Sequence, residues 1–214
     1  MWVPFELGRP FGAPGHPAFQ ERVLRAVLDL LQRPSGPVLE DFPEDAPAAP
    51  APVGQLACPV RFIVEQPVLD DVGSLLAAFQ AEVEGLRNWY DIAVQQRGRT
   101  TAGTTGMTPE AVADFLAACA KGEEPANPVG GISLPTAVKM ASEDLKAYYA
   151  EALLAQPGQA TDAASVANWF WGETAAARVL NAIRLRCLGS DDSECKLLGT
   201  LLLIPRNQLH RFSG

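Results

Sequence analysis

The chain has 214 residues, 48% hydrophobic and 20% charged, so it holds enough apolar side chains for a sizeable hydrophobic core. The formal net charge is −8, and no stretch forms a basic stripe, which excludes binding of nucleic acid through a positively charged surface. Since no run approaches the ~18 apolar residues of a membrane span and the N-terminus lacks the pattern of a signal peptide, we expect a cytoplasmic protein without membrane contact.

The first predicted element is a Gly- and Pro-rich loop that leads into a helix, FELGRPFGAPGHPAFQERVLRAVLDLLQR, residues 5–33. Its glycine spacing fits neither fingerprint of a phosphate-binding loop, and Pro10, Pro14 and Pro17 lack the backbone N–H that such a loop donates. We therefore expect a rigid, extended connection and a helix with Pro17 at its first position. An apolar stripe should follow this helix: Phe19, Val23, Leu24, Val27, Leu28 and Leu31.

The same stretch, LGRPFGAPG followed by Gln20 and VLRAVLDLL, resembles a segment near the C-terminal end of the selenoprotein B component of the glycine/betaine/sarcosine/D-proline reductase family. There, too, a Gly-Pro loop leads into a helix rich in Ala and Leu. The family's chemistry resides in a selenocysteine or cysteine with a second thiol nearby. This chain has no selenocysteine and no C-x-x-C, so the resemblance implies a shared architecture, as in a subunit that kept the scaffold without the redox centre.

Residues 33–55 are rich in Pro, Ala and acidic residues, a composition typical of a linker or of an extended strap on the surface. Within it VLEDF, residues 38–42, could dock as a short strand, and LACPVRFIVEQP, residues 56–67, is the best candidate for an edge strand. We predict an N-terminal loop, helix and strap over 1–55, lying over the bundle or over a partner, and a helical domain over 56–214.

From residue 68 onward the apolar spacing is helical, with Gly98 as a stop signal and Thr108 and Ser133 as N-caps. The sequence therefore predicts a mainly α protein, with one helical-bundle-like domain of five or six helices and at most a minor strand element. The predicted helices of this domain are residues 68–98, 108–122, 134–156, 162–189 and 191–203.

The first candidate site is RNWYDIAVQQRGRTT, where Arg97 and Arg99 flank a glycine and precede Thr100. Guanidinium groups beside a Gly-Thr loop are suited to binding the carboxylate or phosphate of a small anion. Arg87 and Asp91 lie four residues apart on one helix face. The alternative is purely structural: an intrahelical pair between Arg87 and Asp91, followed by a polar helix end.

The second candidate site is NWFWGETAAAR, which contains Trp169, Trp171, Glu173 and Arg178. The two Trp side chains project on different sides of a helix, so at least one should be buried. Apolar surroundings would raise the pKa of Glu173 and suit it to act as a catalytic acid or base. Alternatively, Glu173 is half of a buried ion pair with Arg178 or one of the two loop arginines.

Asp144 and Tyr148 form a third candidate, because residues four apart share a helix face and could hydrogen-bond into a pocket. We expect no metal and no cofactor: there is no Glu-x-x-His pair, and the two histidines lie near opposite ends of the chain. The widely spaced cysteines predict reduced thiols and no disulfide framework: Cys58, Cys119, Cys187 and Cys195.

Two functional hypotheses follow. In the first, the chain is a non-catalytic or accessory helical subunit of a complex, which the resemblance makes reductase-like, and the N-terminal arm binds a protein partner or a second copy. In the second, it is a small-molecule enzyme or anion-binding protein. Glu173 would then transfer protons, Arg97 and Arg99 would bind the anion, and the aromatic candidates would line a pocket between helices.

Overall fold

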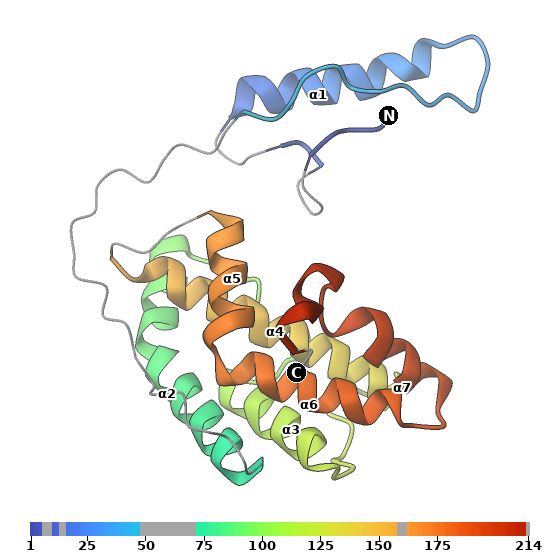
Figure 1. Ribbon diagram of the computed structural model, residues 1–214. Helices are drawn as coiled ribbons and strands as arrows, with labels where there is room; N and C mark the ends of the chain where they lie inside the picture. The colour runs from blue at the N-terminus through green and yellow to red at the C-terminus, as the bar shows by residue number, and fades with distance from the viewer. Residues whose placement is uncertain (6–9, 13–15, 48–71, 158–161, 213–214) are drawn as a thin grey trace. The chain divides into compact units, whose positions relative to one another are not determined.

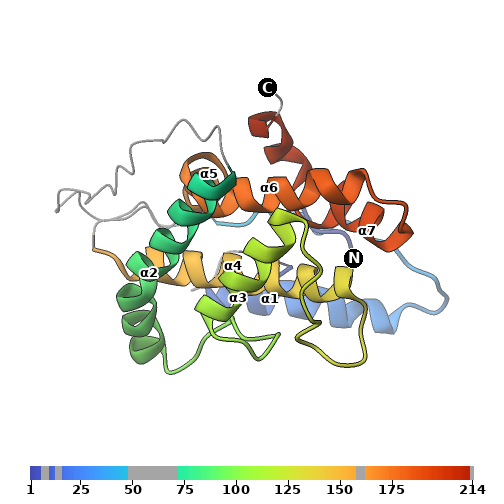
Figure 2. The same cartoon turned by 90° about the horizontal axis from the view of Figure 1, so that it is seen from below.

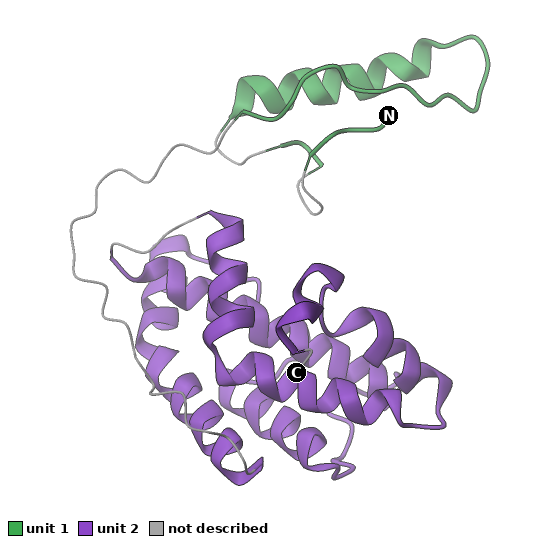
Figure 3. Cartoon of the chain, viewed as in Figure 1, with its two compact units in different colours: residues 1–53 green, residues 54–214 purple. Residues whose placement is uncertain are grey.

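The computed structural model describes residues 1–5, 10–12, 16–47, 72–157 and 162–212, and the chain divides into two compact units, residues 1–53 and 54–214 (Figure 3). Across the described ranges the elements are helical and the only extended pairing is one isolated bridge, so the prediction of a mainly α protein is confirmed. None of the helices found there is long and apolar enough to cross a membrane. The predicted edge strand lies outside the described residues.

Unit 1 contains helix α1 (Pro17–Asp29), which begins at Pro17 as predicted, and the 3-10 turn η1 (Leu30–Gln32). Phe19 and Val23 of α1 are buried together with Phe42 from the following segment. These three side chains form the centre of a small hydrophobic cluster that belongs to unit 1 alone.

Aromatic contacts explain why the opening loop carries a glycine close to α1. The Phe5 ring meets the rings of Phe19 and Phe42 at centroid distances of 5.5 and 5.9 Å. Gly12 has a φ of +80°, and a Cβ at this position would lie 2.7 Å from the Phe19 ring. The position therefore requires glycine for its backbone conformation and for the close approach of Phe19.

The predicted short strand at residues 38–42 is reduced to a single parallel bridge between Trp2 and Asp41. The Trp2 N–H donates to the Glu40 carbonyl oxygen at 2.8 Å, and the Phe42 N–H donates to the Trp2 carbonyl oxygen at 2.8 Å. The pairing fixes the backbone of Phe42, whose ring packs on Phe19 of α1.

Most of the apolar stripe predicted on α1 faces outward. Leu24, Val27, Leu28 and Leu31 are 46%, 40%, 59% and 81% exposed, whereas Phe19 and Val23 are buried. Unit 1 is too small to cover a stripe this wide, so one side of α1 and the adjoining η1 presents four apolar side chains, three from α1 and Leu31 from η1.

In the described part of unit 2, six α-helices are followed by a π-turn and a 3-10 helix (Figure 1). Their bounds are α2 (Val72–Arg97), α3 (Pro109–Lys121), α4 (Leu134–Ala155), α5 (Ala163–Glu173), α6 (Ala175–Leu188), α7 (Ser193–Leu197), η2 (Leu198–Leu202) and η3 (Arg206–Phe212). Helices α2 and α3 each pack on both α4 and α6 and cross from one to the other (Figure 2). Large buried side chains fill the space between these four helices: Phe79, Leu116, Leu145, Tyr148, Tyr149 and Leu180.

Three predicted helix ends are confirmed. The Thr108 side chain accepts the Ala111 N–H at the start of α3, and Ser133 caps α4 in the same way. Gly98, which follows α2, has a φ of +66°, in the left-handed region where glycine commonly ends helices.

The predicted helix over 162–189 is instead two helices, α5 and α6, which meet at Thr174 and run in different directions (Figure 1). Thr174 is extended, with φ −95° and ψ 148°. Its hydroxyl donates to the Phe170 carbonyl oxygen at 2.7 Å and accepts the Ala177 N–H at 3.2 Å. Thr174 is therefore the N-cap of α6, a local signal that the continuous apolar spacing concealed.

The predicted last helix, 191–203, also begins and ends differently. Helix α7 starts at Ser193, where the Asp192 carboxylate accepts the Glu194 and Cys195 N–H groups. The helix continues as the π-turn η2, which ends at Leu202.

Candidate functional site

The loop between α2 and α3 folds onto α4, where two carboxylates hold it. Asp144 and Glu151 lie seven residues apart, hence on one face of α4, and both are buried. They interact with successive parts of the loop, which is built from RTTAGTT, residues 99–105. Both carboxylates therefore bind the loop to α4.

Asp144 accepts five hydrogen bonds from three consecutive loop residues. Its Oδ1 accepts the Gly103 and Thr104 N–H groups at 2.9 and 2.8 Å and the Thr104 hydroxyl at 2.7 Å. Its Oδ2 accepts the Thr105 N–H at 2.9 Å and the Thr105 hydroxyl at 2.7 Å. Burial by itself would raise the pKa of Asp144, but the hydrogen bonds from Thr105 and Thr104 outweigh it, and the pKa is lowered.

Glu151 repeats the pattern one step earlier in the loop. Its Oε1 accepts the Thr101 N–H and hydroxyl, both at 2.7 Å, and its Oε2 accepts the Thr100 hydroxyl at 2.8 Å. Burial opposes ionisation, yet the hydrogen bonds from Thr101 and Thr100 lower the pKa of Glu151 overall. The Tyr90 hydroxyl donates to Thr100 Oγ1 at 2.9 Å and joins α2 to the network.

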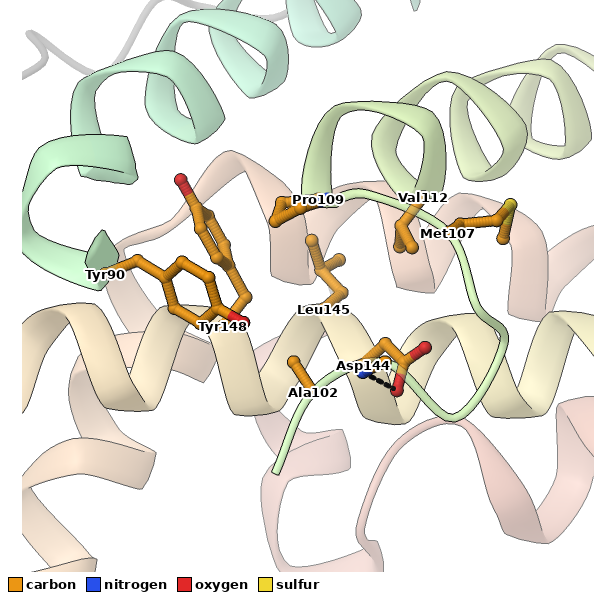
Figure 4. A pocket seen from close by; sticks show the side chains of 9 residues that line it. Tyr90, Ala102, Met107, Pro109, Val112, Asp144, Leu145 and Tyr148 are labelled. Atoms are coloured by element: carbon orange, nitrogen blue, oxygen red, sulfur yellow. Dashed lines mark hydrogen bonds between the residues drawn. The ribbon is translucent and has the colours of Figure 1, made fainter. Parts of the chain in front are cut away.

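A small pocket lies beside this loop (Figure 4). Asp144 and Tyr148 both line it, as their spacing predicts, but they do not bond to each other there: the Tyr148 hydroxyl donates to the Val83 carbonyl oxygen, and the Asp144 oxygens bind the loop. The space open to water-sized molecules is about 40 Å³, enough for a few waters and far below a metabolite site. The lining residues are Tyr90, Ala102, Gly103, Met107, Pro109, Val112, Asp144, Leu145 and Tyr148.

A third carboxylate, Glu82 on α2, binds the start of α6. Its Oε1 accepts the Ala175 N–H at 2.7 Å, and its Oε2 accepts the Ala176 N–H at 3.2 Å and the Tyr149 hydroxyl at 3.1 Å. Burial raises the pKa of Glu82, and its hydrogen bonds and the charge of Arg178 only partly oppose this. Glu82 thus occupies the apolar surroundings that the sequence had suggested for Glu173.

The structure places the predicted site residues in different surroundings. Glu173 is the exposed last residue of α5, so the prediction of an acid in apolar surroundings is wrong: the chain breaks at Thr174 and turns Glu173 outward. Within the described ranges, no hydrogen bond or ion pair joins Glu173 to any of the three candidate arginines: Arg97 and Arg99, which are exposed, and Arg178, which is half-buried.

The other predicted residues contribute to packing, to the loop network or to ion pairs. Trp171 is buried, which confirms the expectation that at least one Trp is buried, and Trp169 is partly buried with its ring centroid 6.0 Å from that of Tyr149. Thr100 belongs to the loop network. Arg87 pairs with Asp91 at 3.0 Å and also with Glu110, so the structural alternative for this pair is confirmed.

Sequence reasoning missed Glu82 and Glu151 and the role of the threonines. A usable signal exists, because Glu82 is in register with the buried residues Phe79 and Leu86. An acidic residue at a core-facing position predicts a set of donors that the rest of the fold must supply.

Comparisons with protein-family models, with curated proteins and with solved structures found no match. The likeness of residues 5–33 to a reductase component therefore stays a prediction. Among the described residues, no three His, Cys, Asp or Glu side chains gather in a way that could hold a metal ion.

Proposed function

We propose that this chain is a non-catalytic helical subunit of a cytoplasmic protein complex, and that it assembles through α1 with a second copy of itself. The observation that carries the proposal is the outward apolar face of α1 and the adjoining η1: Leu24, Val27, Leu28 and Leu31. Their spacing of three and four residues places them on one side of the helix, as in helices that pack on a partner helix.

The distribution of residues along α1 favours a second copy as the partner. In an antiparallel pair with a two-fold axis near residue 27, Leu24 faces Leu31 of the other copy, and Val27 faces Leu28. The same symmetry places Arg25 opposite residue 30 of the other copy, next to Asp29, so unlike charges lie close together at the rim. One patch then supplies both sides of the interface.

The interior of unit 2 supports a structural role. Asp144, Glu151 and Glu82 each direct both carboxylate oxygens at N–H or hydroxyl donors of the chain. The anion-binding alternative loses support because the amides of the threonine loop already bind these carboxylates. The reductase-like assembly implied by residues 5–33 is one setting in which such a subunit would work.

Light scattering on the full-length chain during size-exclusion chromatography tests the proposal. We expect a mass of at least twice the 22.8 kDa of one chain, and a single-chain mass for the Leu28→Glu variant. Leu39→Glu is the matched control, because Leu39 is 78% exposed in the same unit and lies outside α1; this variant should remain assembled. A wild-type chain that stays monomeric at high concentration refutes the proposed self-association.

A further inference from the structure

Two cysteines from neighbouring helices meet where α6 turns into α7, and a third lies on α3. Cys187 lies on α6, Cys195 on α7 and Cys119 on α3, and all three are reduced in the structure. The Sγ atoms of Cys187 and Cys195 are 2.7 Å apart, whereas no hydrogen bond joins Cys119 to either thiol in the described part of the chain. Two of the three thiols are therefore already in reach of each other.

The packing of α7 and η2 on α6 explains why these thiols meet. After Gly189 the chain turns back, so that α7 lies beside the C-terminal half of α6 (Figure 1). Gly199 permits the close approach, because a Cβ there would lie 2.9 Å from both the Arg184 carbonyl oxygen and the Cys187 Cβ. Cys195 is four residues before Gly199, hence on the same side, facing Cys187.

We propose that Cys187 and Cys195 are a redox site: a dithiol that peroxide converts into a disulfide, fastening α7 to α6. The geometry needs only a small adjustment of the two side chains, since their sulfurs already touch. This inference is independent of the proposed assembly through α1.

The two thiols differ in access, which sets the order of the reaction. Cys187 is 5% exposed, and burial, followed by its hydrogen bond with Cys195, raises the pKa of its thiol well above the usual value. Cys195 is partly exposed at the surface. Cys195 therefore meets the oxidant first, and Cys187 resolves the product.

The reaction balances with one hydrogen peroxide. The Cys195 thiolate attacks one peroxide oxygen, the O–O bond breaks, and the released hydroxide takes up a proton, which leaves a sulfenic acid on Cys195. The Cys187 sulfur then attacks the Cys195 sulfur, the S–O bond breaks, and the hydroxide leaves as water with the Cys187 proton. The dithiol loses two electrons and two protons, and the peroxide becomes two waters.

Peptide mapping tests this site directly, because trypsin releases both cysteines in one peptide, CLGSDDSECK, residues 187–196. The full-length chain is reduced, desalted, treated with hydrogen peroxide, denatured and alkylated with iodoacetamide before digestion. We expect this peptide to lack both carbamidomethyl groups and to weigh two hydrogen atoms less than the dithiol form. Reduction with dithiothreitol before alkylation should restore both labels.

Two variants sharpen the test. Cys119→Ser should still give the closed peptide, because Cys119 has no part in the pair, and Cys195→Ser should abolish it. The proposal is overturned if the oxidised chain carries two carbamidomethyl groups on residues 187–196. It is equally overturned if that peptide is cross-linked to the Cys119 peptide, or if Cys195 is oxidised further while Cys187 remains alkylated.

Thermal unfolding gives a second readout that does not depend on digestion. A covalent link between α6 and α7 restricts the unfolded chain, so the oxidised protein should melt roughly 5 °C above the reduced protein. The Cys195→Ser variant should show no such gain after the same peroxide treatment. Equal gains in both proteins would contradict a disulfide at this position.

Discussion

Acidic side chains occupy different kinds of place in the two units. In the described part of unit 1, Glu21, Glu40 and Glu44 are solvent-accessible, and each forms an ion pair with an arginine. In unit 2, Glu82, Asp144 and Glu151 lie at core-facing positions and accept hydrogen bonds from backbone N–H groups. Unit 2 also has exposed ion pairs, such as Arg87 with Asp91, but it adds three carboxylates that bind a loop and a helix start to the core.

Buried and exposed carboxylates should contribute very differently to the free energy of unfolding. An exposed ion pair contributes little to the free energy of unfolding, because water and salt screen the two charges. A buried carboxylate is stable only while fixed donors surround it, and removing it leaves those donors unsatisfied. Unit 1 should therefore depend on its aromatic cluster and unit 2 partly on its carboxylates.

The largest expected effect is the loss of an aromatic ring from unit 1. Phe42→Ala removes one of three buried side chains and should cost about 3–5 kcal/mol, which a unit of this size cannot withstand. Hydrogen exchange measured by mass spectrometry should then show unprotected amides in α1, while α4 stays protected. The control is Phe11→Ala, since Phe11 is exposed; unchanged protection of α1 in Phe42→Ala would contradict the importance of the cluster.

The next effect concerns Asp144. Asp144→Ala leaves the amides of Gly103, Thr104 and Thr105 without their acceptor and should destabilise unit 2 by about 3 kcal/mol in urea unfolding. Glu143→Ala is the matched control, because Glu143 is the adjacent, exposed acid of the same helix and should have no measurable effect. Equal losses in both variants would mean that the loop does not depend on Asp144.

The stability of unit 2 at low pH should also depend on the hydrogen bonds of Asp144. The pKa of Asp144 is lowered in the folded state, so its contribution is complete at pH values above its usual 3.8 and is lost as the pH falls below that value. Asp144→Asn should therefore reduce the loss of stability in acid, measured as the urea midpoint at successive pH values. An acid profile identical to that of the wild type would contradict the assignment.

Local features of the fold were predictable from the sequence. Thr108, Ser133 and Gly98 act through hydrogen bonds or dihedral angles within a few residues, so their roles can be read from neighbouring positions. The break at Thr174 is local too, but its signal competes with apolar spacing that continues across it. To predict such a helix boundary, the capping signal of a Thr must be compared with the apolar spacing that continues on both sides of it.

The candidate site was less predictable because its contacts are distant in sequence. Asp144 binds residues about 40 positions earlier, and Glu82 binds amides more than 90 positions later. The neighbouring Trp and Ala residues suggested that Glu173 is buried. Its exposure is instead decided by the helix break at Thr174, which follows it directly. Sequence alone placed acids correctly on helices without showing which of them face the core.

A smaller effect with the opposite pH dependence is expected for Glu82. Its pKa is raised in the folded state, so the unit is most stable below the usual carboxyl pKa of 4.5 and loses stability as the pH rises through the folded value. Glu82→Gln keeps an oxygen for the Ala175 N–H and removes the charge, so it should abolish this decline and change stability at neutral pH by only about 1 kcal/mol. Urea midpoints between pH 4 and 8 provide the measurement; a decline that persists in Glu82→Gln would assign it to another group.

The smallest expected effect is the loss of a surface pair in unit 1. Arg33 pairs with Glu40 at 2.7 Å, but both side chains are more than 40% exposed, so the pair competes with water for little gain. Arg33→Ala should leave the protection of α1 amides unchanged at low and at high salt, because the ion pair contributes too little stability for salt screening to matter. A clear, salt-dependent loss of protection would show that surface charge does hold unit 1 together, and the contrast between the two units would then rest on the carboxylates of unit 2 alone.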